Sequence, residues 1–292
     1  MSVFLPNEVN INNIKFGDIK TMSSGGKIVY VNYGKEDTKG VNYDVLNIQT
    51  PYLRLPFDVS RFKDPENHTE KYTFNGSLDN HEDDQNVKEL YDKLCEIDEK
   101  VKKYAKDNSV VFFKKKTMSD ETINELYNPI VKLSRDSETG EPNGKYSPMI
   151  KIKINRKDDK FQCKMYDNKK TEFDINNETE EPFNIEKLLC KNTRCKILIR
   201  CTGVWIINGK FGCSWKAVQM KFNVAKKDLD DYSFRDDDSD GFVSSESEDE
   251  EKNKDEDKGE SESDSESDSE SEEEEIVEVK PKKKVRKAKT SK

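Results

Sequence analysis

Residues 203–222 read GVWIINGKFGCSWKAVQMKF, and this stretch carries the strongest fold signal in the chain. Two apolar runs flank Asn208-Gly209, a dipeptide that favours a tight hairpin turn because its residues tolerate positive φ. The runs extend in both directions and remain rich in β-branched and aromatic residues. The stretch therefore predicts two long paired strands, 193–207 and 211–224.

Alternation along this hairpin separates the only two tryptophans of the chain. Trp205 falls on the apolar face of the first strand, with Ile197, Ile199, Cys201 and Ile207, and is predicted to be core. Trp215 falls opposite the apolar set of the second strand (Val218, Met220, Phe222 and Val224) and shares its face with Ala217, Gln219 and Lys221. A tryptophan beside lysines can stack on a base while the cations neutralise phosphates, and such stacking is worth about 1–3 kcal/mol per base. A register slip of one residue would invert these assignments.

The same polar face recurs on other predicted strands, at 27–33, 43–48, 52–57, 72–78, 149–154 and 161–166. In the segment 52–57, Leu53, Leu55 and Phe57 point inward by alternation. The outward positions that carry cations or rings are Tyr52, Arg54, Lys151, Lys153, Lys164, Tyr166, Lys196 and Arg200. A polar outer face is ordinary for an antiparallel sheet, so plain solvation is the better explanation of any one pair taken alone. The whole set favours a nucleic-acid-binding surface, together with Trp215 and Lys221.

One segment breaks the period of two. Between Val87 and Ala105 the apolar residues recur at the three- and four-residue spacing of a helix face. Asp83 or Asp84 can cap its start, because a carboxylate accepts from free backbone N–H groups. A shorter helix is predicted to start near Ser119, and a helical turn at 185–189.

The charge is distributed in three blocks. Residues 1–227 hold 39 basic and 34 acidic residues, a net charge of +5, whereas residues 228–279 hold 4 basic and 26 acidic, a net charge of −22. Residues 280–292 hold 8 basic residues and no acidic ones. The acidic block is rich in serine and almost free of apolar residues, so it cannot bury enough surface to fold and is predicted to be disordered. Such segregation indicates a nucleic-acid or basic-protein partner.

The sequence predicts an intracellular chain with reduced thiols. The N-terminal stretch has no basic n-region followed by a long apolar run, so no secretory signal is expected. No window is long and apolar enough to span a membrane. Six cysteines in a chain without a signal indicate free thiols rather than disulfides.

No catalytic or metal-binding motif stands out, and we expect neither enzyme activity nor a cofactor. The segment 23–27 (SSGGK) is too short to cradle a phosphate. The spacing of Cys190, Cys195 and Cys201 is not that of a zinc site, and core thiols explain them better. His68 and His81, the two histidines, fall in a polar region and are predicted to be solvated.

The closing segment resembles a known family. The runs Cys195–Arg200, Gly203–Ile206 and Phe211–Lys221, with Pro51–Phe57 and Tyr127–Lys132 upstream, resemble the single-stranded-DNA-binding proteins of large nucleocytoplasmic DNA viruses. That family is similar to the podophage type of single-strand binder. The resemblance covers most of 25–225. It implies an OB-fold that coats single-stranded DNA during replication, and an acidic C-terminal tail.

The predicted architecture is mainly β. An N-terminal extension (1–24) precedes an OB-fold-like antiparallel barrel (25–227) with a helical insertion near 83–107. A disordered acidic tail (228–279) and a basic tip (280–292) follow. The basic tip departs from the family's acidic terminus.

The two tails suggest separate roles. The acidic tail can occupy the DNA groove as a phosphate mimic and, once displaced, recruit replication proteins; a merely solubilising tail is the alternative. The tip reads as a nuclear-import signal or a nonspecific contact, through Lys282, Lys283, Lys284, Arg286 and Lys287. The host nucleus or a viral replication factory is the expected location.

Three functions compete at this stage. The first is binding of single-stranded DNA, the second an acidic-tailed chaperone for histones or other basic proteins, and the third a virion scaffold. The body charge of +5 favours the first, because a histone chaperone gains from acidic surfaces. Self-association into a homo-oligomer is left open.

Overall fold

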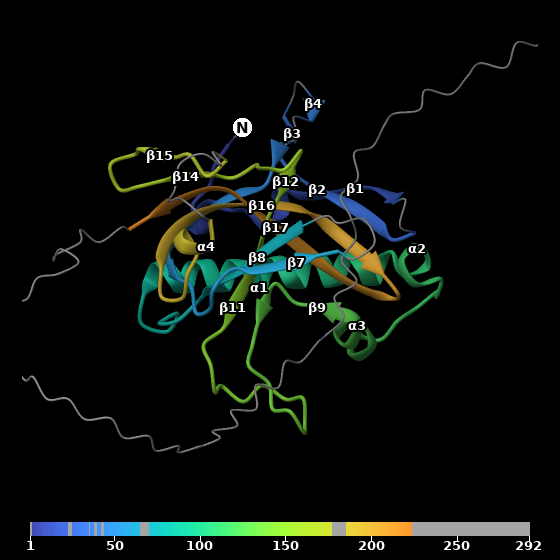
Figure 1. Ribbon diagram of the computed structural model, residues 1–292. Helices are drawn as coiled ribbons and strands as arrows, with labels where there is room; N and C mark the ends of the chain where they lie inside the picture. Colours follow the sequence, from blue (N-terminus) through green and yellow to red (C-terminus); the bar gives the residue numbers. More distant parts are fainter. Residues whose placement is uncertain are drawn as a thin grey trace, which may run out of the picture.

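The computed structural model describes residues 2–22, 25–34, 36–37, 40–41, 44–64, 70–176 and 185–223. These residues form a mixed sheet of 13 strands, two small two-stranded sheets and one long helix (Figure 1). The prediction of a mainly β fold with a helical insertion is confirmed. The segments 228–279 and 280–292, and the predictions made for them, lie outside the described residues.

Five strands close into a barrel. They are β6 (Asn47–Arg54), β8 (Glu70–Ser77), β11 (Met149–Ile154), β16 (Arg194–Ile207) and β17 (Lys210–Phe222). Each pairs with the next in the order β6–β8–β11–β17–β16, and β16 returns to β6. In chain order this is 1-2-3-5-4-1, the Greek-key connectivity of an OB-type barrel. The third and fifth strands pair in parallel, which the prediction of an antiparallel barrel did not include.

The hairpin of β16 and β17 contains two bulges that set which side chains face the core. Leu198 pairs with Gln219 but Ile199 pairs with Ala217, so Val218 is an extra residue on β17. Cys201 pairs with Trp215 but Gly203 pairs with Ser214, so Thr202 is extra on β16. An extra residue shifts the two-residue alternation, and everything beyond it turns to the opposite face.

The two tryptophans are therefore exchanged relative to the prediction. Trp215 lies before the Val218 bulge and is 2% exposed, on the same inner face as Phe211, Ala217 and Met220. Trp205 lies beyond the Thr202 bulge and is half-buried on the outer face, while Val204 and Ile206 point into the core. The predictions that Trp215 faces outward and that Trp205 is core are both wrong.

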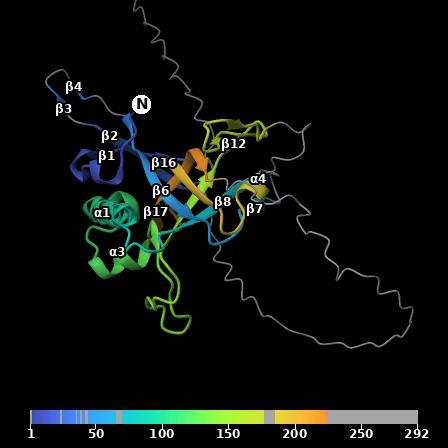
Figure 2. The ribbon, with the colours of Figure 1, turned by 90° about the vertical axis from the view of Figure 1, so that its left-hand side faces the viewer.

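Helix α1 (Gln85–Asp107) confirms the predicted helix. The Asp84 side chain accepts from the backbone N–H groups of Asn86 and Val87 and so caps the first turn. One face of the helix is buried against the core, through Val87, Leu90, Leu94, Ile97, Val101 and Ala105. Figure 2 looks along the axis of α1 and shows it on one side of the barrel strands, next to α3 (Asp120–Leu126). Helix α3 starts next to Ser119, as predicted, and the Ser119 side chain caps it.

The predicted N-terminal extension is packed onto the body. Strand β1 (Ile14–Thr21) pairs with β2 (Lys27–Tyr33), which in turn pairs with β16, so the barrel sheet continues outward through both. Val9 and Ile14 are buried, and Phe16 stacks on Tyr104 of α1. Residues 2–22 are therefore part of the folded body.

Shorter elements complete the described chain. The strands are β3 (Glu36–Asp37), β4 (Gly40–Val41), β5 (Asp44–Val45), β7 (Ser60–Lys63), β9 (Tyr127–Asn128), β10 (Val131–Lys132), β12 (Arg156–Lys157), β13 (Lys160–Phe161), β14 (Lys164–Tyr166) and β15 (Glu172–Phe173). The helices are η1 (Pro6–Glu8), η2 (Ile11–Asn13), α2 (Ser109–Phe113) and α4 (Ile185–Leu188). The predicted strand 161–166 is thus divided between β13 and β14, and α4 matches the predicted turn.

Phe57 departs from the alternation predicted for 52–57. Strand β6 ends at Arg54, just before Pro56, and Phe57 is 55% exposed while Leu53 and Leu55 are buried. Among the described residues, no helix is both long and apolar enough to cross a bilayer.

Candidate nucleic-acid interface

An upper row of side chains crosses four strands on the outside of the barrel. Lys196 of β16 is the Cα partner of Tyr52 on β6 and of Lys221 on β17, and Lys221 is the partner of Tyr166 on β14. Directly paired residues share a face, so the order is ring, cation, cation, ring. Four predicted site residues, which span positions 52 to 221 of the sequence, are brought together here.

A lower row lies four residues along β16. Arg200 pairs with Lys216 of β17, and Lys216 pairs with Lys153 of β11. The distance between the two rows is about 13 Å at the rise of an extended strand. We call the seven residues of both rows the cationic face: Tyr52, Lys153, Tyr166, Lys196, Arg200, Lys216 and Lys221.

The cationic face places like charges directly opposite one another. Lys196 faces Lys221, and Lys216 faces both Arg200 and Lys153. Like charges in directly opposed positions destabilise a sheet, with pair terms of about 0.2–1 kcal/mol. In the upper row, an anion bound between Lys196 and Lys221 would reduce this repulsion.

The rings of the upper row are held at its two ends. Tyr52 is 37% exposed, the Lys196 Nζ lies 5.0 Å from its ring centroid, and its hydroxyl donates to Asn168 Oδ1 at 3.3 Å. Tyr166 is half-buried, and its hydroxyl donates to Glu172 Oε2 at 3.4 Å. The hydrogen bonds at the hydroxyl groups fix the orientation of both rings at the ends of the row.

Other predicted site residues have partners that reduce their availability. Arg54 forms an ion pair with Asp79 (2.8 Å), and Lys164 forms one with Glu172 (3.2 Å), which raises the pKa of Lys164. Arg200 donates from Nε to Asn47 Oδ1 at 2.8 Å, which orients its guanidinium. Lys151 faces outward on β11, opposite Asn75 of β8, beside the lower row.

Sequence reasoning missed two residues of this surface. Simple alternation places Lys216 on the same face as Val218, Met220 and Phe222, because the bulge at Val218 is not visible in it. Two adjacent apolar residues, Ala217-Val218, are the signal that could have revealed it. Phe62 of β7 is 58% exposed and pairs with Lys71 of β8, so it adds a ring beside the lower row.

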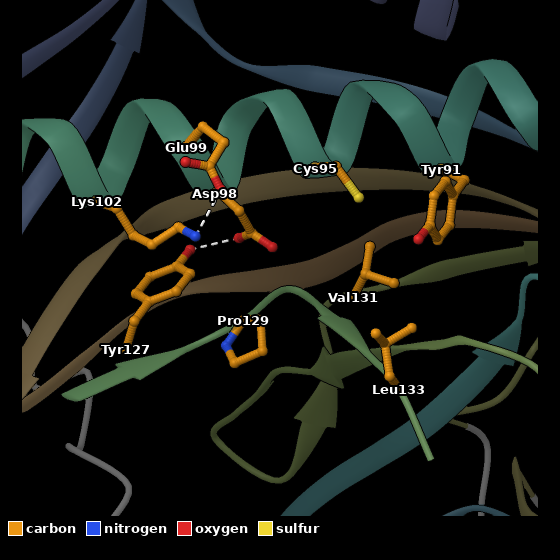
Figure 3. A pocket seen from close by; sticks show the side chains of 9 residues that line it. All are labelled: Tyr91, Cys95, Asp98, Glu99, Lys102, Tyr127, Pro129, Val131 and Leu133. Carbon is orange, nitrogen blue, oxygen red and sulfur yellow. Dashed lines mark hydrogen bonds and ion pairs between the residues drawn. The ribbon is translucent and has the colours of Figure 1, made fainter. Parts of the chain in front are cut away.

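A small pocket lies between α1 and the β9–β10 segment (Figure 3). Asp98 is its buried carboxylate. It accepts from the Tyr127 hydroxyl and from the Ile130 N–H at 3.1 Å, and burial raises its pKa to about 6. These contacts connect α1 to the β9–β10 segment, so we interpret the role of the pocket residues as structural.

The described residues hold no cluster of side chains suited to a metal ion. His81 is half-buried, packs against Tyr91 with ring centroids 4.5 Å apart and planes tilted by 33°, and contacts the Leu78 carbonyl at 3.1 Å. The prediction that it is solvated is wrong, and His68 lies outside the described residues. Each of the six cysteines is a free thiol, as predicted.

No protein family model matches the chain, and no curated protein matches it. Solved structures similar to it include the single-stranded-DNA-binding protein from bacteriophage Enc34 in complex with ssDNA, at 12% identity and a TM-score of 0.39, over 66% of this chain and 94% of that chain. A C-terminal truncation of the Enc34 protein matches at 14% identity and a TM-score of 0.37, over 70% and 98%. The single-stranded-DNA-binding protein gp2.5 of bacteriophage T7 matches at 10% identity and a TM-score of 0.35, over 65% and 98%.

Proposed function

We propose that this chain binds single-stranded DNA without sequence specificity through the cationic face, and protects it during viral DNA replication and recombination. The observation that carries the proposal is the upper row, in which Lys196 and Lys221 stand side by side between the rings of Tyr52 and Tyr166. In this proposal the lysines neutralise phosphates and the rings stack on bases.

Single strands suit this face better than a duplex does. Stacking on a side-chain ring requires an exposed base face, which a paired duplex keeps within its own stack. Every base has such a face, so the contacts tolerate any sequence. An OB-type barrel binds oligonucleotides on the outside of its second and third strands, and here β11, the third, supplies Lys153 to the lower row.

The acidic segment 228–279 extends the proposal to regulation. Strand β17 ends at Phe222, directly after Lys221 of the upper row, and the acidic segment begins a few residues later. The segment is therefore tethered next to the cations it would neutralise. We propose that it competes with DNA for the cationic face and, when displaced, recruits replication proteins.

The basic tip supports a proposal on location. We propose that residues 280–292 act as an import signal and that the chain works in the host nucleus or a viral replication factory, as a protein of the large-DNA-virus type that its sequence resembles. Fusing this tip to an inert reporter tests it. Accumulation of the reporter in the nucleus supports the proposal, and a cytoplasmic reporter contradicts it.

The binding proposal is tested by titrating the full chain into labelled oligo-dT and following anisotropy at several salt concentrations. We expect the Lys196→Ser/Lys221→Ser variant to bind more weakly. Its plot of log affinity against log salt should be shallower by about 1.4, since each phosphate contact on a single strand contributes about 0.7.

The matched control removes two lysines from α1, in the variant Lys88→Ser/Lys103→Ser, where both side chains are exposed. This variant loses the same charge but should keep the affinity and slope of the unmodified chain. Equal effects in the two variants, or no binding of oligo-dT by the unmodified chain, would contradict the proposal.

A further inference from the structure

A third row on the outer face of β16 extends beyond the barrel. Trp205 is the Cα partner of Ile28 on β2 and of Gly212 on β17, and Ile28 is the partner of Lys20 on β1. This row lies on the same outer face of the β16–β17 hairpin as the cationic face, on the far side of the Thr202 bulge. The outer surface thus continues from the barrel onto β1 and β2.

Gly212 gives the Trp205 indole its position. A Cβ at Gly212 would lie 2.9 Å from Trp205 Cζ2 and 3.1 Å from Cε2, so the six-membered part of the indole rests directly on the glycine. The same Cβ would lie 2.8 Å from the Asn128 carbonyl oxygen. Only glycine leaves room for the ring here, and the half-buried indole keeps part of its surface in contact with solvent.

A second ring lies nearby on the same face. Tyr30 is two residues beyond Ile28 on β2, so it shares the outer face and is diagonal to Trp205, at about 7–8 Å between backbones. It is 37% exposed, and the Lys20 Nζ lies 5.2 Å from its ring centroid. The combination of exposed ring and adjacent lysine repeats the chemistry of Tyr52 and Lys196.

We propose that Trp205 and Tyr30, with Lys20, form a second stacking site for the same nucleic-acid strand, at the β1–β2 side of the barrel. This inference rests on the proposed function and deepens it, because it assigns further base contacts. Two features favour an unpaired polynucleotide as the occupant: the site continues the cationic face along one hairpin, and it pairs rings with a cation. The strand would run along β16, from the upper row to Trp205.

Tryptophan fluorescence gives a direct test, because the chain has one buried and one outer tryptophan. Base stacking quenches an indole that it touches, so oligo-dT should quench the Trp215→Phe variant, in which only Trp205 emits. Oligo-dT should leave the emission of the Trp205→Phe variant unchanged. Anisotropy of labelled oligo-dT should still show that this variant binds. Quenching of Trp205→Phe with loss of quenching in Trp215→Phe would overturn the proposal.

Affinity provides the second test. Tyr30→Ala should weaken binding of oligo-dT about 5- to 150-fold, the equivalent of one stacking contact. Tyr146→Ala is the matched control, because Tyr146 is 63% exposed with Lys145 Nζ at 5.4 Å from its ring but lies on the loop between β10 and β11, away from this face. The control should bind as the unmodified chain does.

The outcomes separate this inference from the function on which it rests. If Lys196→Ser/Lys221→Ser weakens binding while Tyr30→Ala does not, the second stacking site is wrong and the proposed function stands. If the unmodified chain does not bind oligo-dT, both are wrong. Thermal melting of each variant identifies any loss of affinity that comes from unfolding.

Discussion

Asp98 is the one charged side chain among the buried residues of the described chain, and it is 6% exposed. It accepts from the Tyr127 hydroxyl and from the Ile130 N–H, and Lys102 lies on the same side of α1. The loss of hydration outweighs these favourable contacts, so its pKa rises from 3.8 to about 6. The folded state therefore holds a proton on Asp98 over a pH range in which the unfolded chain releases it.

The raised pKa of Asp98 makes the stability of the folded state depend on pH in a definite direction. Because the folded pKa is the higher one, the contribution of Asp98 is largest below pH 4 and is lost as pH rises through about 6. A shift of this size corresponds to about 3 kcal/mol. We expect the stability difference between the unmodified chain and Asp98→Asn to move in favour of the unmodified chain as pH falls from 7 to 4, measured by urea unfolding. A difference that is constant with pH would contradict the assignment.

Thiol reactivity at the residue scale follows from burial. Burial raises the pKa of Cys163 and of Cys195 to about 12. The hydrogen bond with Cys201, together with burial, raises the pKa of Cys213 well above its usual value, so few thiolates form at these three positions. Cys190 is the exposed cysteine. A thiol-reactive dye should therefore label one cysteine rapidly in the native protein. Cys190→Ser should abolish that fast phase, and a fast phase that persists in this variant would show that a thiol other than Cys190 is accessible.

At the scale of elements, the two bulges decide what the closing hairpin presents. Without the extra residue Val218, the inner face of β17 could not hold both Trp215 and Met220, which are an odd number of residues apart. The bulge brings both indole and thioether into the core and turns Lys216 and Lys221 outward together. The lower and upper rows share one face of the barrel for this reason.

The close packing of β17 against β9 gives a prediction at this scale. Gly212→Ala would place a methyl 2.8 Å from the Asn128 carbonyl oxygen and 2.9 Å from the Trp205 indole, and overpacking of this kind costs about 1–3 kcal/mol. Gly17→Ala is the control, since its nearest neighbours are 3.6 Å away. Thermal melting should show a clearly lower melting temperature for Gly212→Ala and little change for Gly17→Ala. Equal melting temperatures would mean that β9 moves aside at no cost.

The sequence predicts well those structural features that are determined by residues within a single segment of the chain. Helix α1, its Asp84 cap and the strict alternation of β11 follow from residues within one segment, and all three are observed. The bulges depend on pairing between distant strands, so alternation placed Trp205 and Trp215 on the wrong faces. Of the ten predicted DNA-binding residues, six lie together in the cationic face, because outward positions on neighbouring strands converge once the barrel closes.

At the scale of the whole molecule, the proposed competition between the acidic segment and DNA depends on where the charges lie along the chain. The folded body carries cations on one outer face, and the block of −22 is attached close to the end of β17, where the upper row lies. A short tether keeps the effective concentration of such a segment high, so under the proposed function even a weak attraction to the cationic face would compete with DNA.

Deleting residues 228–279 should therefore tighten binding of oligo-dT, and the gain should be greatest at low salt, where the attraction between tail and body is least screened. Anisotropy titrations of both forms across a salt series measure it. A chain in which this segment is replaced by an uncharged Gly/Ser segment of equal length is the control. It should bind as tightly as the deletion, because charge and not bulk is removed. If both forms bind as the unmodified chain does at low salt, the segment does not compete for the cationic face, and solubility is the better account of its charge.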